Sequence, residues 1–252
     1  MSVSDRRIFI GDVHGHYDGL MNLLETIAPA ASDQVYFVGD LIDRGPKSAQ
    51  VIEFVRQQGY RCVLGNHEQL LLEAFPGSNK VSHFALQAWL QSGGQTTVSS
   101  YIEPDHLLEN IEWLRTLPTH LDLGDIWLVH AGLHPGLSID DQTTQEYCWI
   151  REEFHSMSQP YFADKLIITG HTITFTLPGV APGKLAQGQG WLDIDTGAYH
   201  PKSGWLSAFD YTHQQVYQFN VYSKRSRTLP LAKATTQIEP SQIVRRRQLL
   251  QL

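Results

Sequence analysis

Cysteine is scarce in this sequence and long apolar runs are missing, and both absences narrow the class of protein. The two cysteines, Cys62 and Cys148, are too few for a disulfide framework, so we expect reduced, structural thiols. No apolar run reaches the roughly 18 residues that a transmembrane helix needs, and residues 1–5 lack the layout of a signal peptide. We therefore expect a cytoplasmic protein without a membrane partner.

A surplus of positive charge is also missing. The formal net charge is −7, whereas proteins that bind nucleic acid usually carry a concentrated basic surface that neutralises phosphates. We therefore expect no nucleic-acid partner, and any attraction for phosphate has to be local. The chain has 252 residues, 42% of them hydrophobic, which is enough to bury one sizeable core.

Short apolar runs that end at glycine alternate with helical patterns in the first third of the chain. The predicted strands and helices are, in order, strand 7–10, helix 17–28, strand 35–38, helix 47–58 and strand 60–64. This alternation is typical of βαβ units, in which parallel strands are joined by helices.

The rest of the chain divides into a helical part and a strand-rich part. The apolar spacing over 66–117 predicts a helical insertion, and the pattern after Pro118 predicts mostly strands. Basic residues then accumulate in 223–252. We therefore expect a catalytic domain over 1–222 and a peripheral basic C-terminal tail over 223–252.

Clusters of polar side chains follow the predicted strands at the points where the strands end. The motifs are GDVHGH at 11–16, GDLIDRG at 39–45, GNHE at 65–68, VHAG at 129–132 and GHT at 170–172. Ligands bind at the carboxyl ends of strands in open α/β sheets, so these loops can surround one point. We therefore expect a catalytic site at that point.

The potential metal ligands in these motifs are imidazoles, carboxylates and one amide, without a thiolate. This mixture of nitrogen and hard oxygen donors suits two divalent ions, with manganese as first choice and iron or zinc as alternatives. A single carboxylate can bridge two such ions, and Asp40 is the expected bridge. The candidate ligands are Asp12, His14, Asp40, Asn66, His130 and His171.

Three further residues of the motifs suit phosphate chemistry. Two divalent ions turn a shared water into hydroxide and stabilise charge on the attacking and leaving oxygens, which hydrolysis of a phosphate ester requires. Arg44 offers a planar fork of donors for phosphate oxygens. His67, held by Asp43, is a candidate acid for the leaving-group oxygen. Taken singly, Asp12 could cap a turn and Asp43 could pair with Arg44 on the surface, but the agreement of five loops favours a site.

The five motifs in this order resemble the calcineurin-like metallophosphoesterases, specifically the bacterial members of the phosphoprotein phosphatase group, over about residues 7 to 210. The resemblance implies an α/β (α+β) fold in which two mixed β-sheets form a sandwich flanked by helices. It also implies that one ion is held by Asp12, His14 and Asp40, and the other by Asp40, Asn66, His130 and His171.

A second phosphate-binding arginine is implied by the same resemblance. The string over 149–153 is similar to the segment that supplies it, which makes Arg151 the candidate. The alternative is an arginine on a helix surface paired with a glutamate, a contact that contributes little to stability.

The resemblance implies a metal-dependent phosphoprotein phosphatase that hydrolyses serine, threonine or tyrosine phosphomonoesters by attack of a metal-bridging hydroxide. Its partner would be a phosphorylated protein or peptide. The alternative is a symmetrical diadenosine-tetraphosphate hydrolase, a branch that typically reads GDxQGC and lacks the aspartate before the arginine of the second motif. The segment 14–16 and the pair Asp43-Arg44 favour the phosphatase. A non-catalytic scaffold is a third interpretation, but every candidate ligand and His67 are present.

Overall fold

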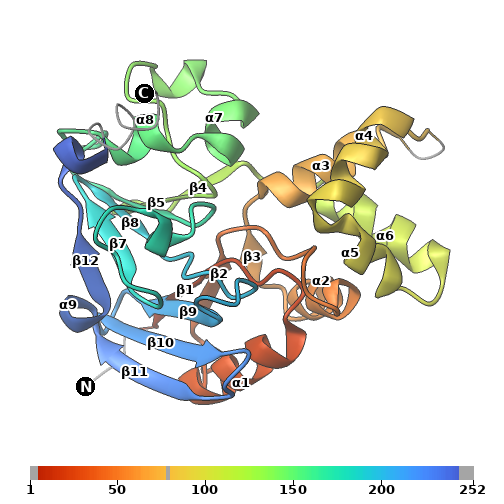
Figure 1. Ribbon diagram of the computed structural model, residues 1–252, viewed down its shortest axis with the longest axis horizontal. Coiled ribbons are helices and arrows are strands. Elements are labelled where there is room, and N and C mark those ends of the chain that lie inside the picture. The colour runs from red at the N-terminus through yellow and green to blue at the C-terminus, as the bar shows by residue number, and fades with distance from the viewer. Residues whose placement is uncertain (1–4, 78–79, 244–252) are drawn as a thin grey trace.

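The first of two β-sheets joins the N-terminal βαβ units to a C-terminal hairpin. The computed structural model describes residues 5–77 and 80–243 (Figure 1). The sheet has six strands in the order β11-β10-β9-β1-β2-β3. They are β1 (Arg7–Ile10), β2 (Gln34–Phe37), β3 (Arg61–Cys62), β9 (Trp205–Asp210), β10 (Gln215–Asn220) and β11 (Ser226–Pro230). The first three are parallel and the last three run antiparallel to their neighbours.

The second sheet is built from the strand-rich part of the chain. Its six strands have the order β12-β7-β8-β6-β5-β4. They are β4 (His120–Asp122), β5 (Ile126–Val129), β6 (Leu166–Thr169), β7 (Leu185–Gly188), β8 (Trp191–Asp193) and β12 (Thr235–Gln237). Strands β5, β6 and β8 are parallel, whereas β4 and β7 are antiparallel to their neighbours in that group. The expected sandwich of two mixed sheets flanked by helices is therefore confirmed.

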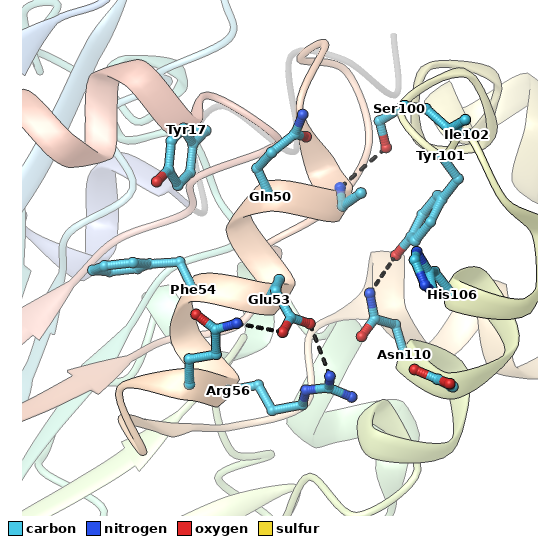
Figure 2. A pocket seen from close by; sticks show the side chains of 13 residues that line it. Tyr17, Gln50, Glu53, Phe54, Arg56, Ser100, Tyr101, Ile102, His106 and Asn110 are labelled. Carbon is cyan, nitrogen blue, oxygen red and sulfur yellow. Dashed lines mark hydrogen bonds and ion pairs between the residues drawn. The ribbon is translucent and has the colours of Figure 1, made fainter.

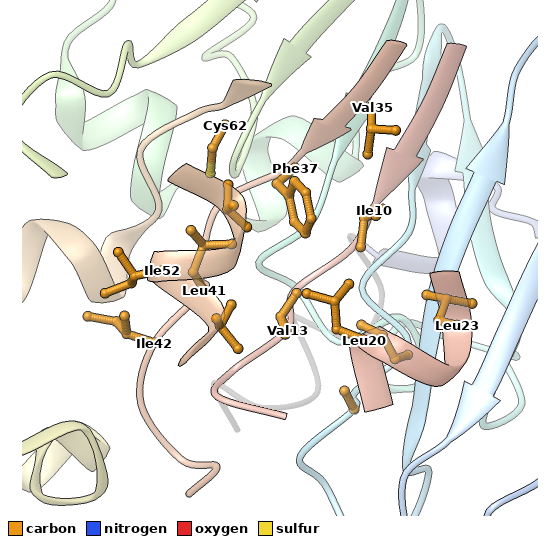
Figure 3. Close-up of a cluster of buried hydrophobic side chains, with 14 of the residues drawn as sticks. Ile10, Val13, Leu20, Leu23, Val35, Phe37, Leu41, Ile42, Ile52 and Cys62 are labelled. Carbon is orange, nitrogen blue, oxygen red and sulfur yellow. The ribbon is translucent and has the colours of Figure 1, made fainter. Parts of the chain in front are cut away.

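Buried side chains alternate between the two faces of the first sheet, as the period of a strand requires. Phe9 stacks on Tyr36 at 5.1 Å between the two sheets. Ile8 and Ile10 point the other way, toward α1 (Tyr17–Ile27) and α2 (Ser48–Gln57), whose apolar faces complete a second cluster (Figure 3). Both crossover helices agree with the predicted ranges to within one residue at each end.

The predicted helical insertion stands to one side of the sheets, next to α2 (Figure 1). It consists of α3 (Asn66–Ala74), α4 (His83–Trp89), the segment η1 (Leu90–Gly94), which is kinked at Gly93, α5 (Gln95–Ser99) and α6 (Pro104–Leu114). The remaining helical segments are η2 (Ile139–Asp141), α7 (Thr144–Trp149), α8 (Glu152–His155), η3 (Thr174–Thr176) and α9 (Leu231–Ala234). None of the helices within the described ranges is long and apolar enough to cross a membrane.

The sequence-based boundary at residue 222 falls inside the sandwich. Strand β11 pairs with β10, and β12 adds an edge to the second sheet beside β7. Residues of β11 alternate between exposed and partly buried, as expected for an edge strand. Basic residues suggested a peripheral tail, but Arg227 of β11 is half-buried and donates to Oε1 of Gln218 at 2.7 Å. The arginine run at 245–247 lies outside the described residues.

Candidate active site

Strands from both sheets end at one edge of the sandwich, and the motif loops that follow them meet there. Loops after β1, β2 and β3 come from the first sheet, and loops after β5 and β6 come from the second. The six candidate ligands are all buried, with exposed fractions between 0% for His130 and 6% for Asn66 and His171. The structure therefore brings residues from five separate loops into one cluster.

Asp40 occupies the centre of this cluster. Its Oδ2 lies 3.5 Å from Nε2 of His14, and its Oδ1 lies 3.4 Å from Nε2 of His130. The two groupings of possible ligand atoms in the described chain, His14 with Asp40 and His67 and Asp12 with Asp40 and His130, share only Asp40. This geometry suits a carboxylate that contacts two ions.

Asn66 links the two histidines that come from the second sheet. Its Oδ1 lies 3.0 Å from Nε2 of His130 and 2.8 Å from Nδ1 of His171. The backbone N–H of His171 in turn donates to the carboxylate of Asp12 at 3.1 Å. These contacts thus connect candidate ligands in the loops of the first sheet with those in the loops of the second sheet.

Backbone carbonyls orient two of the imidazole rings. Nδ1 of His14 donates to the carbonyl of Ile42 at 2.9 Å, and Nδ1 of His130 donates to the carbonyl of Val38 at 2.7 Å. A carbonyl only accepts, so Nδ1 carries the proton and the Nε2 lone pair faces Asp40. Burial lowers the pKa of His14 to about 3 and also lowers the pKa of His130, which favours the neutral, ligating form.

The pKa values of the carboxylates in the cluster are shifted in opposite directions. Burial and the charges of Asp195 and Asp40 raise the pKa of Asp12 well above its usual value, and burial raises the pKa of Asp195 to about 7. Burial also opposes ionisation of Asp40, but the surrounding imidazoles, His130 foremost, hold its pKa below the usual range. Buried acids and neutral imidazoles form a donor set that fits divalent cations.

The backbone of the motif loops adopts a conformation that side chains other than glycine rarely accept. Most of the described non-glycine residues with positive φ belong to the site: His14 at 46°, Asp40 at 48°, Asp43 at 70°, Arg44 at 69° and His171 at 70°. Such strain persists only where the surroundings hold it in place, and it clusters at functional sites.

Glu68 organises the loop of Asp40, although the sequence analysis quoted it in the GNHE motif without giving it a role. Its fully buried carboxylate accepts from the backbone N–H groups of Asp40 at 2.9 Å, Leu41 at 2.8 Å and Gly65 at 3.1 Å. Burial, with the charge of Asp40, raises its pKa to about 8. A glutamate three residues after a strand-ending glycine is the signal that could have identified it.

His67 and Asp43 form the expected pair. Nδ1 of His67 lies 2.6 Å from Oδ2 of the fully buried Asp43. Burial alone would lower the pKa of His67, but the charges of Asp40 and Asp43 and the hydrogen bond to Asp43 raise it. Nε2 lies 4.0 Å from Asp40 Oδ2, so it faces the centre of the cluster.

Both candidate phosphate-binding arginines line the same cavity, which has a volume of about 190 Å³. The exposed guanidinium of Arg44 lies 5.0 Å above the ring of Tyr199. Nη1 of Arg151 donates to the carbonyl of His171 at 3.2 Å and to Oγ1 of Thr172 at 3.1 Å. Tyr199 also lines the cavity, and no motif in the sequence pointed to it.

A larger cavity lies elsewhere and contains none of the predicted site residues. It has a volume of about 500 Å³ and lies over α2, beside the connection from α5 to α6 (Figure 2). Tyr17, Phe54 and Tyr101 line it. Size alone therefore does not identify the catalytic centre, which is recognised by its converging polar groups.

The chain belongs to the calcineurin-like phosphoesterase family, whose model matches residues 6–189. A symmetrical bis(5'-nucleosyl)-tetraphosphatase of Dechloromonas aromatica is 37% identical over 129 residues, which are 50% of this chain and 43% of that protein. One of Vibrio campbellii is 28% identical over 200 residues, which are 74% of this chain and 70% of that protein. The chain spans about half the length of most of the curated relatives that it matches.

Solved structures share the fold at lower identity. A crystal structure described as a putative diadenosine tetraphosphatase has a TM-score of 0.59 and 22% identity, covering 91% of this chain and 95% of its own. A protein serine/threonine phosphatase of Saccharomyces cerevisiae has a TM-score of 0.58 and 14% identity, covering 90% of this chain and 80% of its own. Phosphatases and nucleotide hydrolases therefore share this architecture.

The expectation of a phosphorylated protein or peptide as partner is wrong, because the curated relatives are named for a dinucleotide substrate. The expectation depended on segment 14–16 and on the pair Asp43-Arg44. In the structure His14 and Arg44 line the cavity, and Asp43 binds Nδ1 of His67. They do not form a surface that distinguishes a peptide from a nucleotide, so they could not decide the substrate.

Proposed function

We propose that this chain hydrolyses a phosphoric anhydride bond of a dinucleoside tetraphosphate and releases two nucleoside diphosphates. The observation that carries the chemistry is the single cavity in which the central Asp40, the acid candidate His67 and the two arginines meet. The substrate class is supported by the curated relatives and was the alternative that the motifs had left open.

We propose a role for two divalent ions, with manganese as first choice. One would be held by Asp12, His14 and Asp40, and the other by Asp40, Asn66, His130 and His171. When bound, such ions lower the pKa of a water and neutralise charge on phosphate oxygens. The donor set supports two ions because it is buried, contains oriented imidazoles and has one carboxylate that both groupings share. The groupings place Asp12 with His130 and His67 with His14, so the division of the ligands between the ions follows the family resemblance.

Substrate binding falls to Arg44 and Arg151. Both guanidinium groups border the cavity and can form paired hydrogen bonds with phosphate oxygens. Trp149 and Tyr199 also line the cavity and present aromatic surfaces on which a base of the substrate could stack.

His67 would protonate the oxygen that leaves with one nucleoside diphosphate. Asp43 holds Nδ1, which leaves Nε2 directed toward the cavity. A positioned acid of this kind typically contributes about 10²–10⁴-fold to a rate. Water adds to phosphorus, the bridging P–O bond breaks, and each product keeps two phosphoryl groups.

The decisive experiment is steady-state hydrolysis by metal-stripped protein with and without added Mn²⁺. Diadenosine tetraphosphate is compared with a phosphoserine peptide, and the products are separated by ion-exchange chromatography. Mn²⁺-dependent formation of ADP as the only nucleotide product is expected. Formation of ATP with AMP would contradict symmetrical cleavage, and turnover of the peptide alone would overturn the proposal.

A further inference from the structure

We infer that the helical insertion is part of the catalytic apparatus, in which Trp89 and Thr97 are positioning residues for the Asp43–His67 pair. The inference rests on the proposed function, because it concerns the acid proposed there. Neither residue belongs to a motif loop: Trp89 ends α4 and Thr97 lies in α5.

Both residues donate hydrogen bonds to the carboxylate that holds the imidazole. Nε1 of Trp89 lies 3.1 and 3.0 Å from the two oxygens of Asp43. Oγ1 of Thr97 donates to Asp43 Oδ1 at 2.6 Å, while Oδ2 faces His67 Nδ1. The insertion therefore determines which oxygen of Asp43 faces His67.

The same hydroxyl also binds the backbone of Asp43. The backbone N–H of Asp43 donates to Oγ1 of Thr97 at 2.9 Å and to Oγ of Ser48 at 3.0 Å, and the two hydroxyls lie 2.9 Å apart. Asp43, Thr97 and Ser48 are all fully buried. A buried network with every polar group paired holds its members in one geometry.

The kinked segment η1 between α4 and α5 adds a contact to the neighbouring arginine. Gly93 has φ of 119°, and its carbonyl lies 3.4 Å from the backbone N of Arg44. Gly94 packs so closely on the indole of Trp89 that a Cβ would clash with it. One short segment thus contacts both the acid pair and the phosphate-binding loop.

The insertion is also attached to the helix that follows this loop. The backbone N–H of Ala49 in α2 donates to Oγ of Ser100 at 3.0 Å, a bond visible in Figure 2. Together with the contact between Thr97 and Ser48, it fixes the end of α5 against the start of α2. These contacts hold the insertion rigidly against α2. Rigid support of this kind keeps a catalytic group in its productive geometry.

Removal of one hydrogen-bond donor to Asp43 should slow only the step in which His67 protonates the leaving group. Thr97→Val keeps the volume of the side chain and removes its hydroxyl. We expect hydrolysis of phenyl phosphate, a poor leaving group, to slow about tenfold, which is the effect of one hydrogen bond to a charged group. Hydrolysis of 4-nitrophenyl phosphate should slow less than about twofold, because its leaving group needs little protonation. Thr97→Ser should restore the phenyl phosphate rate.

Ser99→Ala serves as the matched control. Its hydroxyl donates only to the carbonyl of Gln95 one turn earlier and does not approach Asp43. His67→Ala provides the reference for the acid itself. If His67→Ala slows both substrates equally, the proposed acid role fails. If it discriminates between them and Thr97→Val does not, the acid role stands and the positioning inference is overturned.

A spectroscopic measurement needs no turnover. The Nδ1 proton of His67 is identified in a ¹H spectrum of ¹⁵N-histidine-labelled protein by its loss in His67→Ala. Thr97→Val and Trp89→Phe are expected to shift this resonance or accelerate its exchange, while Ser99→Ala leaves it unchanged. An unchanged resonance in Thr97→Val would overturn the inference, and a melting curve establishes that each variant is folded.

Discussion

The motif loops and the helical insertion approach the same centre in different ways. The loops deliver side chains from strand ends on strained backbone, with positive φ at His14, Asp40 and Asp43. Beyond α3, which begins with the GNHE motif, the insertion instead reaches the centre with Trp89 and Thr97, whose side chains contact Asp43 and are not among the lining residues of the cavity. The comparison teaches that the motif residues supply the proposed chemistry, while this later part of the insertion supports their alignment.

The largest effect is expected in the loops, from Asp40→Asn. Removing the charge of the shared carboxylate should weaken binding of both ions and slow hydrolysis of diadenosine tetraphosphate by about a thousandfold. Manganese content measured by atomic emission, together with kcat, checks this. Asp122→Asn, an exposed position bound to Lys165, is the control. A fully metallated Asp40→Asn protein would remove Asp40 from the bridging position.

A smaller but more selective effect is expected from His67→Ala. The variant should keep its metal content and lose about a hundredfold in rate on phenyl phosphate, with a much smaller loss on 4-nitrophenyl phosphate. The physical reason is that only the poor leaving group needs a proton as its bond breaks. Parallel measurements of metal content and of both rates separate this role from that of Asp40, which should affect both substrates.

Gly93→Ala tests the insertion. A Cβ at φ of 119° would lie against the side chain of Arg44, and strain of this kind costs about 1–3 kcal/mol. We expect KM to rise about tenfold with little change in kcat, because the role proposed for Arg44 is to bind phosphate before and during the reaction. Gly77→Ala is the matched control, since nothing lies within 4 Å of its Cβ. A lower kcat at unchanged KM would indicate that the insertion acts on the acid alone.

The smallest effect is expected far from both regions, at the ion pair between Arg7 and Asp125. The hydrogen bond from Arg7 lowers the pKa of Asp125 to about 2. The pair therefore stabilises the fold above the ordinary pKa of an aspartate and loses this contribution as the pH falls from about 4 to 2. Arg7→Gln should change the free energy of unfolding by less than about 1 kcal/mol at neutral pH, as measured in urea. The difference should vanish at low pH.

Sequence reasoning was most successful where the residues that define an element or a candidate ligand lie within a few positions of one another. The ranges of α1 and α2, the two mixed sheets and the insertion over 66–117 agree with the structure. The last strands were not recognised, because β11 is an edge strand within a segment in which basic residues accumulate. Segment β12 spans only three residues and is defined by its pairing with β7, which no local pattern reports.

The sequence by itself determined the family, the identities of the candidate ligands and their order, because each motif combines a strand end, a glycine and a polar side chain within a few residues. Only the tertiary structure brought Trp89, Thr97 and Tyr199 to the site, and only it showed which oxygen of Asp43 faces His67. These contacts join residues that are far apart in the chain. Their geometry depends on how the insertion packs on α2, and packing of this kind leaves no periodic signal in the sequence.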